Sequence, residues 1–266
     1  MNALIAAILG LIQGLCEFLP VSSSGHLLLA EKLFGIEDGG YFFTVLLHLG
    51  TLAAVLFVYR RRIIEMILHP VKQFKYWLWM IVATVVTVVM ALAFDDVIDE
   101  AGSGKVLGFC FLLTALLLLL TDIMRRRTRA GMTVPTMKWY HAVLIGFMQG
   151  VAILPGVSRS GATITGATAC RLTREDSAEF SFLLSIPAIL GGAVLEIPKA
   201  IAEGTANVPA FSCVVGIVVA AVSGYFAVRF MIHLITKRSL IGFSIYTAAL
   251  GVFVLLDQFV LHLINW

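Results

Sequence analysis

The chain has 266 residues, of which 60% are hydrophobic and only 13% are charged, and its mean hydropathy is +0.98. This apolar content excludes an ordinary water-soluble globular domain, and the net charge of +3 is too small to suggest a nucleic-acid partner. We therefore expect an all-α polytopic membrane protein that lies in a lipid bilayer.

The N-terminal region, residues 1–34, is apolar but is interrupted in its middle by the stretch Leu19-Pro20-Val21-Ser22-Ser23-Ser24-Gly25. Such a break is tolerated at membrane depth only where the backbone is buried in protein or faces a wet cavity. The region therefore predicts a re-entrant helical hairpin. It has no basic segment before its apolar stretch, so we expect it to be retained and not cleaved as a signal peptide.

Six apolar segments are long enough to cross a bilayer core as helices. Three follow the first hairpin, at about 41–59, 76–94 and 105–124, and three close the chain, at about 178–198, 209–235 and 240–264. Between these groups, residues 140–172 are again apolar but are interrupted by Leu154-Pro155-Gly156-Val157-Ser158-Arg159-Ser160-Gly161. The predicted fold has six transmembrane helices and two re-entrant helical hairpins.

The two interrupted regions are copies of each other. A shift of 136 residues places Gly10, Gln13, Gly14, Val21, Ser22, Ser24 and Gly25 on Gly146, Gln149, Gly150, Val157, Ser158, Ser160 and Gly161. After the hairpins, a shift of 137 aligns Phe43, Leu46 and Leu47 with Phe180, Leu183 and Leu184. We therefore expect one membrane domain, 1–266, made of repeats at about 1–125 and 139–266. Because each hairpin precedes an odd number of spans, the second repeat should have inverted topology.

Basic residues indicate the orientation. They gather in the predicted loops near 60–75, 125–138, 171–174 and 237–238, which this topology places on one face. The positive-inside rule makes that face cytoplasmic. We expect both termini and the first hairpin on the outer side, so a site at its tip should be accessible from outside.

The two breaks predict a phosphate site. Ser22, Ser24 and Gly25 precede one apolar stretch, and Ser158, Ser160 and Gly161 precede the other, so hydroxyls and backbone N–H groups can converge on an anion at two helix N-termini. The same serines are equally suited to capping those helices. Arg159 adds a planar donor fork that matches phosphate oxygens.

Ionisable groups at the first break predict catalysis. Gln13 and Glu17 share a helix face and could hold a divalent cation, Mg²⁺ or Ca²⁺, beside bound phosphate. His26 is suited to general acid or base catalysis, and Ser23 could be a nucleophile with His26 as its base. Water activated by His26 or Glu17 is the alternative nucleophile. His48 could also reach the site, although a structural hydrogen bond explains it better.

The stretches from Gln13 to His26 and from Pro155 to Thr163 resemble the two signature motifs of the bacterial undecaprenyl pyrophosphate phosphatase family, the bacitracin-resistance type. The resemblance extends over the whole chain, including the segment 179–184. It departs from many members at Gln13, where they carry a second glutamate.

The resemblance implies an inner-membrane hydrolase. Its substrate would be undecaprenyl pyrophosphate, and its product undecaprenyl phosphate would be recycled as the lipid carrier for cell-wall precursors, with resistance to bacitracin as a consequence. Glu17, Ser23, His26 and Arg159 match the family's functional positions, with Thr163 in the same pocket. We also allow for a homodimer. The alternative is a flippase for polyprenyl phosphate, since transporters also build sites from inverted repeats and broken helices.

Overall fold

The computed structural model describes residues 1–35, 40–127, 131–202, 208–264 and 266. The regular secondary structure of these residues is helical, apart from an isolated bridge between Met132 and Leu172. In the first half, the helices are α1 Ala3–Phe18, α2 Ser23–Phe34, α3 Gly40–Val58, α4 Arg60–Leu68, α5 Phe74–Ala93, α6 Asp95–Ala101 and α7 Leu107–Arg127. In the second half, they are η1 Val134–Thr136, α8 Trp139–Val151, α9 Arg159–Ala169, α10 Arg174–Ala202, α11 Ala210–Lys237, α12 Ile241–Leu256 and η2 Asp257–Leu261.

Every predicted span coincides with a helix, namely α3, α5, α7, α10, α11 or α12. Among the described residues, five helices are by themselves long and apolar enough to cross a bilayer, and a sixth span is added when α3 and α4, bent by 71°, are taken together. The predicted all-α, multi-pass membrane fold is thus confirmed. The two interrupted regions form the helix pairs α1–α2 and α8–α9, and their re-entrant insertion stays a prediction.

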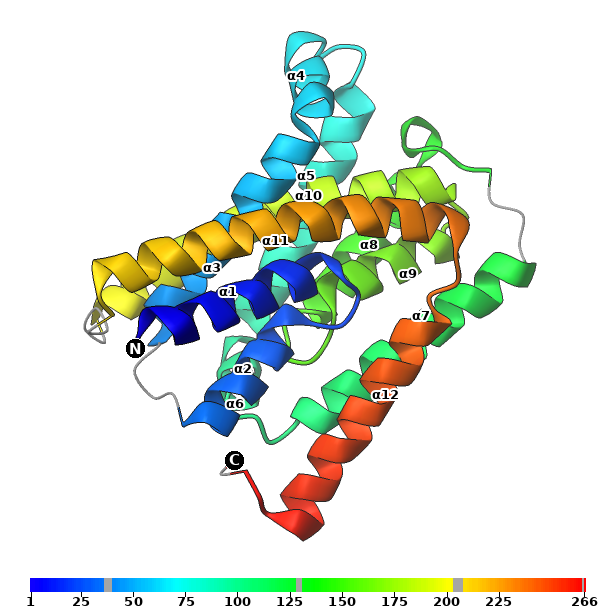
Figure 1. Ribbon diagram of the computed structural model, residues 1–266. Helices are drawn as coiled ribbons and strands as arrows, with labels where there is room; N and C mark the ends of the chain where they lie inside the picture. The colour runs from blue at the N-terminus through cyan, green and yellow to red at the C-terminus, as the bar shows by residue number, and fades with distance from the viewer. Residues whose placement is uncertain (36–39, 128–130, 203–207, 265) are drawn as a thin grey trace.

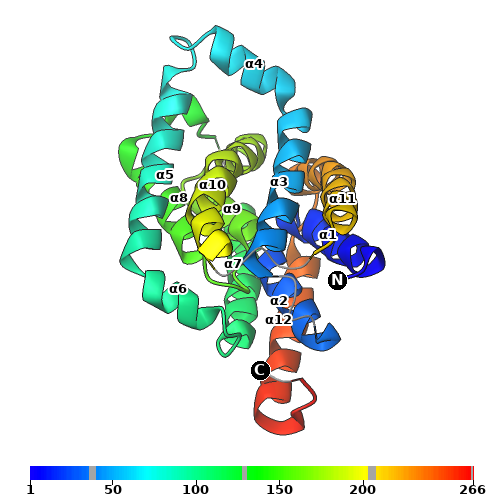
Figure 2. The same ribbon diagram turned by 90° about the vertical axis from the view of Figure 1, so that its left-hand side faces the viewer.

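The helices of the two halves pack in matching pairs (Figures 1 and 2). Helix α1 lies along α11 of the second half, and α8 lies along α5 of the first. Two further pairs join equivalent helices directly, α3 with α10 and α7 with α12. The first helix of each broken pair therefore packs mainly against the half to which it does not belong.

Glycines make the close packing of α1 on α11 and of α8 on α5 possible. A Cβ on Gly10 of α1 would lie 2.5 Å from the carbonyl oxygen of Gly216 in α11. At the equivalent place in the other half, a Cβ on Gly146 of α8 would clash with the carbonyl oxygen of Ala83 in α5. Small residues allow such close backbone approach in membrane helices. The helix contacts at both positions require the absence of a side chain.

The breaks between paired helices follow from their local sequences. Pro20 lies just beyond the C-terminus of α1, and Ser22, with φ of 72°, turns the chain into α2. In the second break, Gly156 has φ of 95°, a conformation that glycine adopts without strain. The two breaks touch, because a Cβ on Gly25 would lie 2.8 Å from the Cα of Gly156. The fold thus brings together two segments that are far apart in the chain.

Candidate active site

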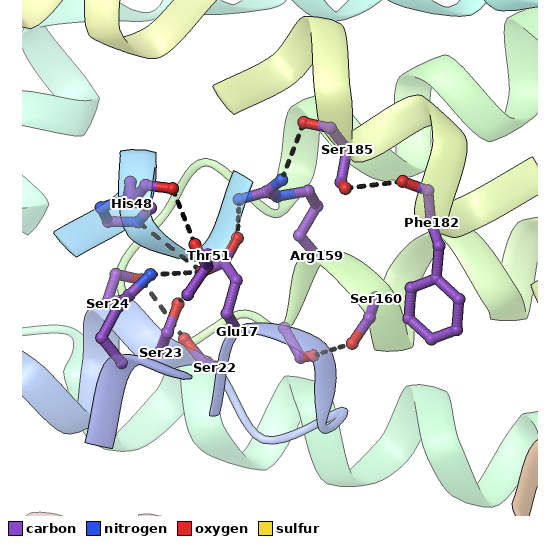
Figure 3. Close-up of polar contacts among 12 residues, drawn as sticks. Glu17, Ser22, Ser23, Ser24, His48, Thr51, Arg159, Ser160, Phe182 and Ser185 are labelled. Carbon is purple, nitrogen blue, oxygen red and sulfur yellow. Dashed lines mark hydrogen bonds and ion pairs between the residues drawn. The ribbon is translucent and has the colours of Figure 1, made fainter. Parts of the chain in front are cut away.

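Glu17 lies at the centre of the polar cluster formed where the breaks meet (Figure 3). It is in the last turn of α1, and its side chain is 1% exposed. Ser23, the first residue of α2, donates its hydroxyl proton to Glu17 Oε2 over 2.6 Å. An oxygen–oxygen distance this short is typical of a charge-assisted hydrogen bond. The Glu17 carboxylate therefore accepts the Ser23 proton in this hydrogen bond and orients the Ser23 hydroxyl.

Arg159 balances the charge of Glu17. Its Nη2 donates to Glu17 Oε1 in a close ion pair, and its Nη1 donates to the backbone oxygen of Ser185 in α10 over 3.4 Å. Arg159 is the first residue of α9, so the second break supplies the cation for the acid of the first. A buried carboxylate is costly unless it is paired, and this pair meets that requirement.

Two further side chains approach the same carboxylate. Gln13, one helical turn before Glu17, donates from Nε2 to Oε2 over 2.9 Å. His48 of α3 places Nε2 3.7 Å from the same oxygen, while its Nδ1 lies 2.8 Å from the backbone oxygen of Thr44. His48 therefore combines the structural hydrogen bond expected from the sequence with a place beside Glu17 (Figure 3).

Two of the predicted phosphate-binding serines, Ser22 and Ser158, cap helices. Ser22 Oγ accepts from the backbone N–H of Gly25 at 3.3 Å and from that of Gly156 at 3.1 Å. Ser158 Oγ accepts from the N–H of Gly161 at 3.1 Å. Of the two interpretations, capping is the one that these contacts show. Ser22 also ties the first break to the second through Gly156.

The remaining predicted phosphate ligands lie around this core. Ser24 Oγ is 3.3 Å from Ser22 Oγ, and Ser160 Oγ donates to the backbone oxygen of Leu19 at 3.3 Å. Thr163 donates to the backbone oxygen of Arg159 at 2.8 Å and lies 2.6 Å from Ser181 Oγ. Thr163 thus fixes the first turn of α9, from which Arg159 projects.

His26 has partners other than Ser23. Its Nδ1 lies 2.7 Å from the backbone oxygen of Ser22, and its Nε2 lies 2.8 Å from the hydroxyl of Tyr246 in α12. Since the Ser22 oxygen only accepts, Nδ1 carries a proton, and in the neutral imidazole Nε2 then accepts from Tyr246. The Tyr246 ring also stacks on the imidazole, with centroids 5.7 Å apart. The expected hydrogen bond from Ser23 to His26 is replaced by the one to Glu17.

Three contributors to the site escaped prediction. Thr114 of α7 accepts from the N–H of Ser158 at 2.9 Å and donates to the oxygen of Gly156 at 2.8 Å. Its hydroxyl within an apolar span was the available signal. Tyr246 is 220 residues from His26, and Ser185 acts through its backbone oxygen, so neither had a signal in the sequence.

A divalent cation can be tested against these side chains. Gln13 Oε1 is buried and has no hydrogen-bond partner, and it lies on the helix face that carries Glu17. The described residues contain no group of three or more His, Cys, Asp or Glu side chains arranged to hold a metal. Mg²⁺ often binds through one or two protein oxygens together with substrate phosphates. The residues therefore fit an ion that arrives with a phosphate ligand.

Comparison with known proteins establishes the family. Residues 6–253 match the family model described as bacitracin resistance protein BacA. A Carboxydothermus hydrogenoformans protein named undecaprenyl-diphosphatase is 44% identical over 262 residues, covering 97% of this chain and 98% of that protein. A Bacillus cereus protein named undecaprenyl-diphosphatase 3 is 40% identical over 260 residues, with the same coverage. The similarity thus extends over nearly the whole chain, which belongs to the bacitracin resistance protein BacA family.

Proposed function

We propose that this protein hydrolyses undecaprenyl pyrophosphate to undecaprenyl phosphate and inorganic phosphate. The reaction recycles the lipid carrier for cell-wall synthesis and confers bacitracin resistance. The observation that carries the proposal is the hydrogen bond from Ser23 to Glu17, with Arg159 on the other carboxylate oxygen. In this proposal Ser23 is the nucleophile, Glu17 is its base and the Arg159 guanidinium binds phosphate, and all three lie in one cluster. Relatives named undecaprenyl-diphosphatase support the substrate.

Arg159 binds the pyrophosphate group of the substrate in this mechanism. Its guanidinium contacts Glu17 with one nitrogen and the backbone oxygen of Ser185 with the other, so binding pyrophosphate oxygens requires it to exchange one of these partners. Phosphoryl transfer depends mainly on positioning and on neutralising charge in the transition state. Arg159 does both, and exchanging Glu17 for phosphate at one nitrogen frees the carboxylate to act as a base.

Ser23 then attacks the terminal phosphorus. Its Oγ forms the new bond to phosphorus, its proton passes to Glu17, and the bridging P–O bond breaks. The lipid phosphate leaves with the bonding electrons and takes the proton from Glu17. A water molecule, deprotonated by Glu17, then attacks the phosphorus bound to Ser23. The Oγ–P bond breaks, Ser23 Oγ takes the proton back from Glu17, and inorganic phosphate leaves. This route differs from the expected Ser23–His26 pair because Glu17 accepts the Ser23 proton in the structure.

Gln13 and Glu17 would hold a divalent cation, Mg²⁺ or Ca²⁺, that accompanies the substrate. The unpartnered Gln13 Oε1 supports this assignment. When bound, the ion neutralises negative charge on the pyrophosphate.

The enzyme acts in the bacterial inner membrane with its site open to the outer side. Basic loops on the opposite face support this orientation. A homodimer is compatible with the function and stays a prediction.

Phosphate release from undecaprenyl pyrophosphate tests the function. The purified full-length protein is assayed in detergent with Mg²⁺, where no transmembrane gradient can drive transport. We expect release by the wild type and by Glu100→Gln, a control on the exposed side of α6, but not by Glu17→Gln. A folded wild-type protein that releases no phosphate overturns the proposal. Lipid movement in vesicles by that protein would establish the flippase instead.

A further inference from the structure

Two arginines lie exposed on the surface of the helix bundle, near the face that carries the basic loops. Arg60 follows the end of α3, and Arg229 lies on α11, inside a segment long and apolar enough to cross a bilayer. Among the described residues, no carboxylate lies within ion-pair distance of either guanidinium. Arg62, by contrast, forms ion pairs with Glu65 and Glu179. The two exposed arginines therefore lack the neutralisation that their neighbour has.

Each of these arginines lies over an aromatic ring one turn earlier in the chain. The Arg60 guanidinium carbon is 4.5 Å from the centroid of the Phe57 ring, and Arg60 Nη1 donates to the Phe57 backbone oxygen at 2.8 Å. The Arg229 guanidinium carbon is 5.6 Å from the centroid of the Tyr225 ring, and Arg229 Nη1 donates to the Tyr225 hydroxyl at 2.8 Å. A guanidinium that lies over a ring keeps N–H groups at its edge for a further ligand.

The two rings join the arginines into one surface. The centroids of Phe57 and Tyr225 are 5.8 Å apart. Helix α11 packs against α3 (Figure 2) in the same chain direction, since the contact of Gly50 with Ile217 precedes that of the two rings in both helices. Both arginines therefore follow the ring pair in the same direction. We name these four side chains the arginine–aromatic row: Phe57, Arg60, Tyr225 and Arg229.

The arginine–aromatic row lies where an apolar helix ends. Helix α3 ends at Val58, and α4 begins with three successive arginines and is bent from α3 by 71°. Phe57 is 56% exposed, so the row faces outward from the helix bundle. Aromatic rings gather at the boundary between hydrocarbon and lipid headgroups, and long basic side chains near helix ends extend to the same boundary. The anions present at that boundary are lipid phosphates.

We propose that the arginine–aromatic row binds the phosphate headgroup of an anionic phospholipid. This inference goes beyond the proposed hydrolysis and concerns a surface that the reaction does not use. A guanidinium has five N–H donors, and the described residues accept only from Nη1 of each arginine. The remaining donors suit the oxygens of a phosphate diester, and the rings can contact the attached acyl chains. Two positive charges without a described counter-charge favour an anionic lipid over a zwitterionic one.

The other half of the protein supplies an internal comparison. The shift of 137 places Phe57 on Val194, which is 70% exposed. Helices α11 and α5 align with a shift of 133 through their equivalent glycine contacts with α1 and α8, and this shift places Tyr225 on Leu92, which is 64% exposed. It also puts Asp96 at the position of the second arginine. The equivalent surface is therefore open but carries an acid and no aromatic ring, so it should not bind an anionic lipid.

Native mass spectrometry of the purified full-length protein in detergent tests the proposal. Dioleoyl phosphatidylglycerol and dioleoyl phosphatidylcholine are titrated separately into wild type and into Arg60→Gln/Arg229→Gln. The matched control is Arg61→Gln/Lys237→Gln, which neutralises two other exposed basic residues of the same helices, α4 and α11.

The proposal predicts a loss that depends on the lipid. A basic residue near a membrane surface contributes about 1 kcal/mol, so Arg60→Gln/Arg229→Gln should weaken binding of phosphatidylglycerol about thirtyfold and leave binding of phosphatidylcholine unchanged. The control should keep the wild-type preference for phosphatidylglycerol. A wild type without that preference, an Arg60→Gln/Arg229→Gln protein that keeps it, or an equal loss in the control overturns the proposal.

Photolabelling of the wild type covers the case in which the double variant fails to fold. The protein is irradiated with phosphatidylglycerol that carries a diazirine on an acyl chain, and the labelled residues are mapped. Labelling around Phe57 and Tyr225 that unlabelled phosphatidylglycerol displaces, and phosphatidylcholine does not, supports the proposal. Equal labelling around Val194 and Leu92 overturns it, and so does displacement by inorganic phosphate, which would identify a site for soluble anions. Neither measurement involves hydrolysis, so its outcome is independent of the proposed function.

Discussion

Ser23 donates its hydroxyl proton to Glu17 over 2.6 Å although the two residues lie on different helices, α2 and α1. The break at Pro20 and Ser22 turns the chain so that the first residue of α2 faces the last turn of α1. Six residues of sequence thus assemble a nucleophile and its base. Arg159, from the other half, completes the cluster.

Glu17→Gln should separate binding from chemistry. The amide cannot take the Ser23 proton, so kcat should fall by about 10²- to 10⁴-fold. Arg159 is released from its ion pair, so affinity for methylenediphosphonate, a non-hydrolysable pyrophosphate analogue, should stay the same or rise. Steady-state kinetics and calorimetric titration check these expectations. A variant with normal kcat would remove Glu17 from the reaction.

Arg159→Ala should lose most activity, and Arg159→Lys should recover only part of it. The guanidinium contacts Glu17 and the Ser185 oxygen with different nitrogens, whereas a lysine presents a single ammonium group. Phosphate release measures both variants. Full recovery in Arg159→Lys would show that charge alone suffices and that the fork is dispensable.

His26→Asn should retain more activity than His26→Ala. In the structure the ring nitrogen Nδ1 binds the backbone oxygen of Ser22, a strained residue with φ of 72°, and an asparagine amide can replace that donor. Turnover of the two variants is compared at matched folding, checked by thermal unfolding in detergent. If both are equally inactive while folded, His26 transfers a proton as the sequence suggested, with Tyr246 as its partner.

Ser22→Ala should destabilise the protein more than Ser24→Ala does. Ser22 Oγ accepts from two backbone N–H groups, those of Gly25 and Gly156, whereas the contact of Ser24 Oγ among the described residues is with Ser22 at 3.3 Å. Losing a cap and a buried acceptor costs about 1–3 kcal/mol. Thermal unfolding of both variants in one detergent is the measurement. Equal midpoints would argue against a structural role for Ser22.

Gly10→Ala and Gly146→Ala should impair folding, while Gly191→Ala should be tolerated. The first two would place a methyl group against the backbone of the facing helix, whereas a Cβ at Gly191 would meet no described residue within 4 Å beyond its own stretch of helix. Overpacking a helix contact costs about 1–3 kcal/mol or more. Yield of monodisperse protein and its unfolding temperature report the effect. Tolerance at both contact positions would contradict the described packing of α1 on α11 and of α8 on α5.

The helices were predictable because each span is a long apolar run and each break carries Pro, Gly and Ser. All six predicted spans coincide with helices, within a few residues at most ends. The span at 41–59 coincides with α3, and what hydropathy does not encode there is the 71° bend between α3 and α4.

The residues of the site were predictable from the sequence, but some of their hydrogen-bond partners were not. Glu17, Ser23 and Arg159 stand out because ionisable and hydroxyl groups at helix breaks are unusual in a membrane. Ser23 and His26 are one helical turn apart, so the sequence favoured their pairing. In the structure they are not paired, because the turn at Pro20 and Ser22 brings Ser23 to Glu17. His26 instead contacts Tyr246, a residue 220 positions away.

The contact of Gly10 with Gly216 sets an order for biosynthesis. The first hairpin leaves the ribosome when α11 has yet to be translated, and at ordinary elongation rates the wait is roughly 10 to 40 s. Until Arg159 is made Glu17 lacks its ion-pair partner, and until α11 is made α1 lacks its packing partner. The nascent N-terminal hairpin should therefore be held by the insertion machinery, and the two halves expressed as separate chains should accumulate in the membrane only when they are made together.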